Sequence, residues 1–252
     1  MGALWSGKEK VIAILFFILS SSAPLLWQNG YADNVFLGYG DYVSPFDSLE
    51  KLYQLFSVYD LLSLGGADQS FNQSFIPFYT IHVIFEWFGS SSAVATMLIL
   101  CCILFSAQYG FFLYIKAKID HASQSSILII AISSGLLYGA SPYFISNVFP
   151  GHISSLFLIS IFPFLIRYFD NYIENKTYRI PSSVSIKLII CLVLGSAAFA
   201  NIGNFIALVM VFGIYTIFKA STRQKRTLEI CIKFFFFLFF MLLINAWWML
   251  SF

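Results

Sequence analysis

Long apolar runs recur along the chain and are separated by short polar stretches. A transmembrane helix needs roughly 20 mostly apolar residues, and scanning for such runs gives residues 11–28, 91–115, 126–146, 153–169, 186–201, 204–219 and 230–252. The pattern therefore predicts an all-α fold, a polytopic transmembrane helical bundle with about seven spans. We expect it to form a single transmembrane domain over residues 1–252.

Two segments leave the number of spans open. The runs 186–201 and 204–219 meet at Asn201-Ile202-Gly203-Asn204, where the pattern favours a tight helical hairpin over one long interrupted helix. The stretch 74–88 is apolar but short, contains His82 and Glu86, and ends at Gly89. We predict an interfacial or re-entrant helix there. If this stretch instead spans the membrane, every later loop changes side.

Composition supports lipid as the solvent for most of this chain. Of its 252 residues, 59% are hydrophobic, 19% aromatic and only 10% charged, with a mean hydropathy of +0.82, whereas a soluble domain is about a quarter charged. The net charge of +2 comes from short Lys and Arg clusters between the apolar runs, so nucleic acid is not expected as a partner. The four cysteines lie in apolar runs and are interpreted as small core residues.

The distribution of basic residues predicts the orientation. With seven spans and a cytoplasmic N-terminus, 13 of the 14 Lys and Arg residues fall on the cytoplasmic side, and Lys51 alone lies outside. The positive-inside rule requires such a separation of short loops, and an eighth span at 74–88 would destroy it. We therefore expect a multi-pass protein of the cell membrane with its N-terminus in the cytoplasm and the lipid bilayer as its first partner.

The long polar segment, residues 29–73, is then the first extracytoplasmic loop. It carries six acidic residues and one basic residue, Lys51. Polar and apolar positions alternate at helical spacing from Asp47 to Leu64, which predicts an amphipathic helix in the membrane interface. Asp47 and Glu50 fit its N-terminal cap and capping-box partner, so they have a structural role.

Three residues on the predicted outer face are candidates for chemistry. Asp41 lies in Gly38-Tyr39-Gly40-Asp41-Tyr42-Val43-Ser44-Pro45, where the glycines and proline predict a tight turn that aims a carboxylate outward. Asn147 and His152 lie between the third and fourth spans, after Pro142, and could line a wet pocket on that face. The plainer alternatives are a solvated turn aspartate, which also describes Asp33, and a hairpin with a polar tip.

His82 and Glu86 are four residues apart and share one face of a helix. Spacing favours an intrahelical pair over a metal site, because no further ligands accompany them. We predict no metal site from the residues alone.

The order of elements resembles the membrane module of the C-type glycosyltransferase superfamily, whose members use polyprenyl-phosphate sugars. The likeness consists of a first span, a long outer loop with an early acidic residue, interface helices and six further spans. Gly40-Asp41 followed by Pro45, and Tyr138 to His152 with its Ser-Pro and Gly-His elements, resemble large prokaryotic membrane proteins of that type.

The resemblance implies transfer of a sugar from a lipid-linked donor to an acceptor on the outer face, with inversion at the anomeric carbon. Asp41 would be the catalytic base, His152 and Asn147 would bind substrate, and a divalent metal ion is allowed as cofactor. The chain differs in having Lys51 as its single outward cation and fewer spans than most members, so we expect a truncated or split form. The alternative is a non-catalytic multi-pass protein: an inactive partner of another membrane subunit, or a transporter or lipid-handling protein.

Overall fold

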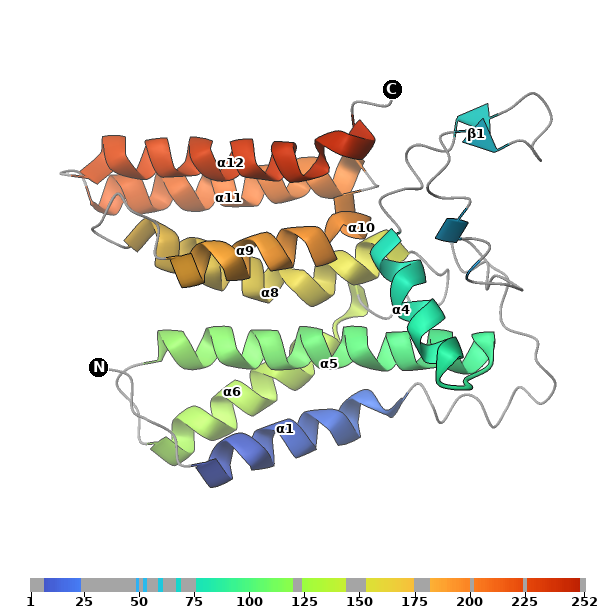
Figure 1. Ribbon diagram of the computed structural model, residues 1–252. Coiled ribbons are helices and arrows are strands. Elements are labelled where there is room, and N and C mark those ends of the chain that lie inside the picture. Colours follow the sequence, from blue (N-terminus) through green and yellow to red (C-terminus); the bar gives the residue numbers. More distant parts are fainter. Residues whose placement is uncertain are drawn as a thin grey trace. The chain divides into compact units, whose positions relative to one another are not determined.

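The computed structural model describes residues 7–23, 49, 52–53, 59–60, 67–68, 76–119, 124–143, 153–174, 182–199, 202–223 and 226–249. Nearly all of the regular structure in these ranges is helical, which confirms the all-α prediction. The helices are α1 (Gly7–Ser21), α4 (Ile76–Trp87), α5 (Ser92–Lys118), α6 (Gln124–Gly139), α8 (Ile153–Glu174), α9 (Ser182–Leu194), α10 (Ser196–Phe199), α11 (Ile202–Thr222) and α12 (Thr227–Met249) (Figure 1).

Four of the described helices are long and apolar enough to cross a membrane. The qualifying segments are Val94–Lys118, Ser154–Glu174, Gly203–Thr222 and Thr227–Ile244, while Ser125–Gly139 is apolar but shorter. The run predicted at 11–28 extends past the described part of α1, which ends at Ser21. Several membrane-length helices are thus confirmed, and the fuller count of about seven spans stays a prediction.

Two short strands replace part of a predicted helix. In β1 (Tyr59–Asp60) and β2 (Ala67–Asp68), Tyr59 pairs with Asp68 and Asp60 with Ala67 in antiparallel register. The amphipathic helix predicted from Asp47 to Leu64 therefore does not continue through residue 60. Gly65-Gly66 lies between the strands in sequence and is a pair that favours hairpin turns, a local signal that the helical spacing obscured.

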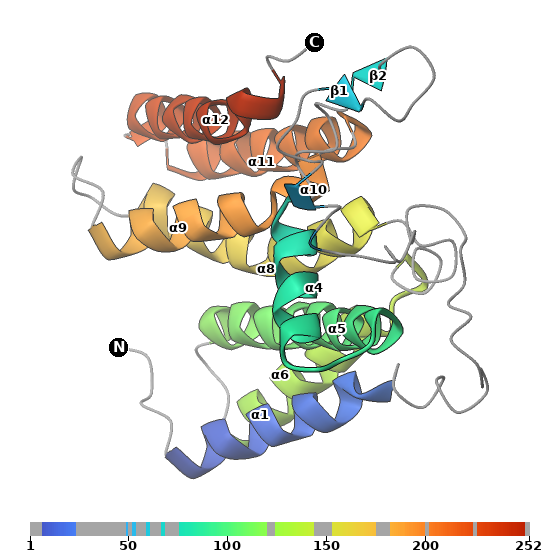
Figure 2. The same cartoon turned by 45° about the vertical axis from the view of Figure 1, so that its right-hand side comes forward.

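The chain divides into two compact units. Unit 1 comprises Met1–Ser48 and Thr80–Phe164, and unit 2 comprises Leu49–Tyr79 and Leu165–Phe252. Helices α1, α5 and α6 lie side by side in unit 1, and α11 packs along α12 in unit 2 (Figures 1 and 2). Within unit 2, α9 and α11 run in opposite directions on either side of the short α10, which agrees with the predicted hairpin.

Unit 1 depends on an unusually close approach between α5 and α6. Gly135 and Gly139 are four residues apart on α6, a small-xxx-small pattern that lets two helix backbones meet. A methyl group at Gly135 would lie 2.6 Å from the backbone carbonyl oxygen of Gln108, and one at Gly139 would lie 2.5 Å from Cγ of the Gln108 side chain. Helix α5 can therefore pack this closely against α6 only because these two glycines have no side chains.

The same contact carries a buried polar link to α1. Gln108 is 4% exposed, and its Oε1 accepts a 2.7 Å hydrogen bond from the Ser20 hydroxyl of α1. One turn earlier in α1, Phe17 is fully buried in a cluster with Phe112 and Ala131. Helices α1, α5 and α6 thus meet in one contact region, and the buried amide of Gln108 has Ser20 as its hydrogen-bond partner there.

Unit 2 is built around a cluster of aromatic rings from three helices. Phe169 of α8 lies with its ring centroid 4.7 Å from those of Phe212 of α11 and Phe237 of α12, and the latter two are 5.0 Å apart. All three side chains are almost completely buried. Edge-to-face contacts of this kind supply packing energy beyond the area buried, so this triad holds α8, α11 and α12 together.

The glycine contact yields a stability prediction. Gly135→Ala should destabilise unit 1 by about 1–3 kcal/mol, because the added methyl meets a backbone carbonyl that cannot rotate away. Gly213→Ala is the matched control on α11, where the nearest atom to an added methyl is a Phe234 ring carbon at an ordinary 3.7 Å. Thermal unfolding of both variants in detergent measures the difference. Equal midpoints for the two would contradict the close approach.

Candidate functional site

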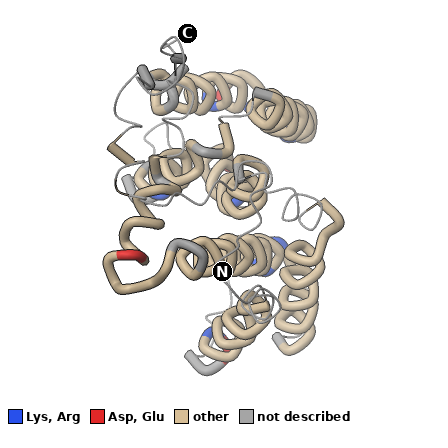
Figure 3. Tube along the Cα trace, turned by 90° about the vertical axis from the view of Figure 1, so that its right-hand side faces the viewer, with Lys and Arg blue, Asp and Glu red and all other residues tan. Residues whose placement is uncertain are grey.

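The three sequence candidates, Asp41, Asn147 and His152, lie outside the described residues. Their roles therefore stay predictions. Within the described ranges, charged residues occupy little of the trace (Figure 3). Two polar groupings stand out there, one at an end of unit 2 and one in unit 1.

The first grouping, the unit 2 charge cluster, gathers where α8 and α11 end and α12 begins. Its members are three carboxylates and four cations: Asp170, Glu174, Glu229, Lys219, Arg223, Arg226 and Lys233. Their i, i+3 and i, i+4 spacing within each helix brings neighbours onto one face. The cluster therefore lies at one end of the helices rather than along their length.

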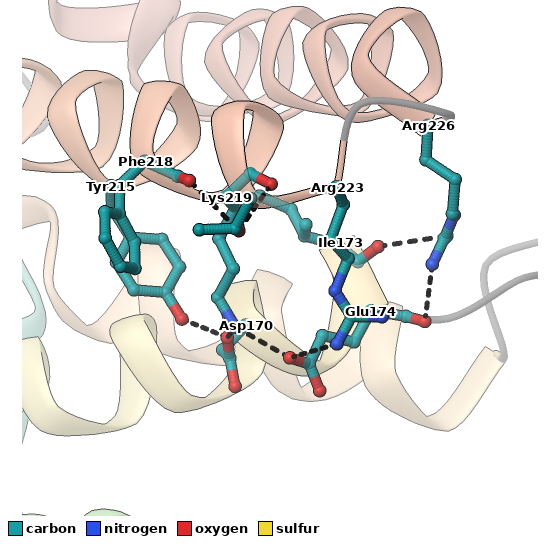
Figure 4. Close-up of polar contacts among 9 residues, drawn as sticks. Asp170, Ile173, Glu174, Tyr215, Phe218, Lys219, Arg223 and Arg226 are labelled. Atoms are coloured by element: carbon teal, nitrogen blue, oxygen red, sulfur yellow. Dashed lines mark hydrogen bonds and ion pairs between the residues drawn. The ribbon is translucent and has the colours of Figure 1, made fainter.

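Lys219 is the centre of the α8–α11 half of the cluster. Its Nζ lies 2.9 Å from Asp170 and 2.6 Å from Glu174, and the Tyr215 hydroxyl also donates to Asp170 (Figure 4). The Asp170 and Lys219 side chains are only 7% and 15% exposed. A pair this far from water depends on each partner to offset the cost of desolvating the other.

Arg226, which directly precedes α12, connects α12 to α8. It forms a two-pronged ion pair with Glu229, at 2.9 and 2.7 Å, the geometry that suits a planar guanidinium. The same guanidinium donates to the carbonyl oxygens of Ile173 and Glu174, each at 3.3 Å (Figure 4). Because the last carbonyls of a helix lack partners within it, Arg226 serves as the C-terminal cap of α8.

The second grouping joins α4 to α5 in unit 1. His82 is fully buried, with Nε2 2.8 Å from the Thr96 hydroxyl and Nδ1 3.2 Å from Glu86. The predicted intrahelical His82–Glu86 pair is confirmed. A tautomer protonated on Nδ1 satisfies both partners, since Nδ1–H donates to Glu86 and Nε2 accepts from Thr96. The contribution of Thr96 could not be predicted from the spacing.

The order hydroxyl, imidazole, carboxylate is that of an activated nucleophile with its base and orienting acid. Thr96, however, is only 2% exposed, so its hydroxyl cannot meet a substrate in this structure. Burial lowers the pKa of His82, and the neighbouring Glu86 partly opposes that shift. The grouping is therefore a buried polar link between two helices.

A metal site is not formed by the described residues. No group of three or more His, Cys, Asp or Glu side chains is close enough to hold an ion in the described ranges. The metal ion allowed by the resemblance would involve Asp41, which those ranges do not include. The cysteines at 101, 102, 191 and 231 are free thiols in helices.

The long apolar helices, with their charges paired at helix ends, suggest a lipid-bilayer environment and a multi-pass helical membrane protein. Comparison of the chain with protein-family models, with curated proteins and with solved structures gives no match.

Asp170→Asn should lower the free energy of unfolding by about 1.5–3 kcal/mol, because Lys219 loses a charged partner at a site largely shielded from water. The matched control is Arg223→Gln, whose partner Glu174 lies 3.6 Å away and whose side chain is about half exposed. That exposed pair should contribute less than about 1 kcal/mol. Reversible unfolding in detergent measures both. A larger loss for the Arg223 variant would refute the central position of Lys219.

His82 should make the fold less stable in mild acid. Its pKa in the folded protein lies below its ordinary 6.5, so the unfolded chain takes up the proton first as pH falls below that value. Stability is thus fully present above the unfolded pKa and declines below it. The unfolding midpoint should fall more between pH 7.5 and pH 5 in the wild type than in His82→Gln. The difference should correspond to the change in unfolding free energy that protonation of one histidine causes. An equal fall in the wild type and in His82→Gln would contradict the lowered pKa of His82.

Proposed function

We propose that this chain is a membrane glycosyltransferase-like protein that transfers a sugar from a polyprenyl-phosphate donor to an acceptor on the outer face. The observation that carries the proposal is the turn sequence Gly38 to Pro45, which presents Asp41 in the acidic segment after the first apolar run. The succession of a first helix, a long segment, a short helix and then membrane-length helices supports it. The likeness to C-type glycosyltransferases supplies the reaction.

Asp41 is the catalytic base of this mechanism. The acceptor hydroxyl oxygen attacks the anomeric carbon while its proton passes to the Asp41 carboxylate. The bond between that carbon and the donor phosphate oxygen breaks, and the lipid phosphate leaves with the electron pair. Attack from the face opposite the leaving group inverts the anomeric configuration.

His152 and Asn147 are the substrate-binding residues of the proposal. An imidazole and a carboxamide can both donate hydrogen bonds to phosphate or sugar oxygens. A bound divalent cation would add positive charge at the donor phosphate. These assignments place the candidate residues on the outward side, where the lipid-linked donor presents its sugar.

The unit 2 charge cluster bears on the competing functions. An ion-coupled transporter keeps ionisable groups inside its spans to bind the coupling ion. The charged residues of the cluster are instead paired with one another near helix ends. This pairing favours the enzyme over ion-coupled transport.

The second candidate is a non-catalytic partner of another membrane subunit. It is favoured by the charge pattern, because Lys51 is the single predicted outward cation and a donor phosphate usually meets a positive group. A partner subunit would then supply that group. Co-purification of a second multi-pass protein, with transfer only in its presence, would support this candidate.

Asp41→Asn should abolish sugar transfer while leaving the fold intact. Loss of a general base costs roughly 10²–10⁴-fold in rate. The measurement is transfer from defined polyprenyl-phosphate sugars by protein in liposomes, with the product anomer determined by NMR. Asp33→Asn is the matched control, since it removes an acid from the same loop and should keep full activity. Equal rates for the two variants, or retention of configuration, would overturn the assignment.

A further inference from the structure

Helix α4 exposes apolar side chains where a helix of a soluble protein would expose polar ones. Its exposed positions are Thr80, Ile84, Trp87 and the following Phe88, spaced at three and four residues along one stripe. Trp87 is 87% exposed and Phe88 83%. The buried face, by contrast, carries His82 at 0% exposure beside Phe78 and Tyr79. Large apolar side chains thus lie on the exposed face, while the one histidine of the helix is buried.

The connection from α4 to α5 is fixed by local hydrogen bonds. Gly89 has a φ of +87°, and its N–H donates to the Glu86 carbonyl at 2.8 Å while the Ser90 N–H donates to that of Phe85 at 3.2 Å. This is a Schellman motif, whose left-handed residue is best supplied by glycine. Ser91 then caps α5 by accepting from the Val94 N–H at 3.4 Å. The turn leaves little freedom in the angle between the two helices.

Helix α4 lies across the direction of α5. Figures 1 and 2 both show it running steeply to the long axis of α5 at that helix's N-terminal end. Residues Thr80 to Trp87 and α5 belong to the same compact unit, and the 2.8 Å His82–Thr96 hydrogen bond ties them together. If α5 crosses the bilayer, α4 must therefore run roughly parallel to the membrane plane.

We propose that the α4 stripe, defined as Thr80, Ile84, Trp87 and Phe88, is a lipid-binding surface. It lies at the boundary between headgroups and acyl chains, at the end of α5 opposite Lys116 and Lys118. Tryptophan prefers this boundary because its ring is apolar and its N–H is polar. The 12 residues of α4 extend only about 18 Å, too short to cross a hydrocarbon core of about 30 Å. The surface anchors the segment that precedes α5.

The α4 stripe contacts lipid rather than water, because a helix of a soluble protein would carry polar residues at its water-facing positions. The stripe carries no charged residue, and the single acid of α4, Glu86, pairs with His82 on the protein side. This inference goes beyond the proposed glycosyl transfer. It holds or fails independently of the role of Asp41.

Depth-dependent fluorescence quenching tests the surface. Trp5, Trp27, Trp247 and Trp248 are replaced by Phe, which leaves Trp87 as the reporter, and the protein is reconstituted in phosphatidylcholine vesicles. Lipids brominated near the glycerol end of the acyl chain should quench Trp87 about two-fold more strongly than lipids brominated near the methyl end. The control is Met210→Trp on the Trp-free background, because Met210 is exposed in the middle of α11. Lipids brominated near the methyl end should quench this tryptophan more strongly than lipids brominated near the glycerol end.

Two outcomes would overturn the proposal. Stronger quenching of Trp87 by the deep bromine would mean that α4 dips into or crosses the hydrocarbon core. Strong quenching by aqueous iodide with none by either lipid would mean that the stripe faces water or another protein. If the single-Trp protein does not fold, a spin label on Trp87→Cys in a cysteine-free background gives the same depth from its relative accessibility to oxygen and to a water-soluble nickel complex.

Discussion

A polar group that leaves water for a membrane has to find its partner inside the protein, and this constraint organises the described structure. His82 is held by Thr96 and Glu86, Gln108 by Ser20, and Asp170 by Lys219 and Tyr215. Among the described residues, Asn204 Nδ2 is the one buried side-chain nitrogen or oxygen without a hydrogen-bond partner. Each link joins two helices or fixes a helix face, so satisfying a polar group also determines which helices are neighbours.

The positions of the helices were largely predictable because lipid imposes a length and an apolar composition on each one. Runs near 91–115, 153–169 and 230–252 correspond to α5, α8 and α12. The extent of the helix predicted after Asp47 was wrong, since helical spacing over Tyr59 and Asp60 did not reveal their pairing with β2. Gly135 and Gly139 show the glycine pattern in the sequence itself, yet only the structure identifies Gln108 as what fills the gap between them.

The polar groupings show where prediction from sequence ends. The i, i+4 pair of His82 and Glu86 follows from one helix alone and was predicted, whereas Thr96 depends on the angle set at Gly89. The unit 2 charge cluster has visible spacing within each helix, such as Asp170 with Glu174. Its essential contacts, however, join residues 45 positions apart. Such contacts depend on packing of the aromatic triad, which no local pattern specifies. Asp41, Asn147 and His152 rest on sequence alone.

The cap that Arg226 places on α8 has a consequence for how the protein is made. The carbonyl oxygens of Ile173 and Glu174 accept from a guanidinium more than 50 residues later in the chain. When the ribosome has just completed α8, that donor has not yet been synthesised, so these carbonyls must remain with water or lipid headgroups. The α8 end closes only after α9, α10 and α11 have been made and the first turn of α12 emerges. Capping of the α8 C-terminus by Arg226 is therefore a late step of biosynthesis.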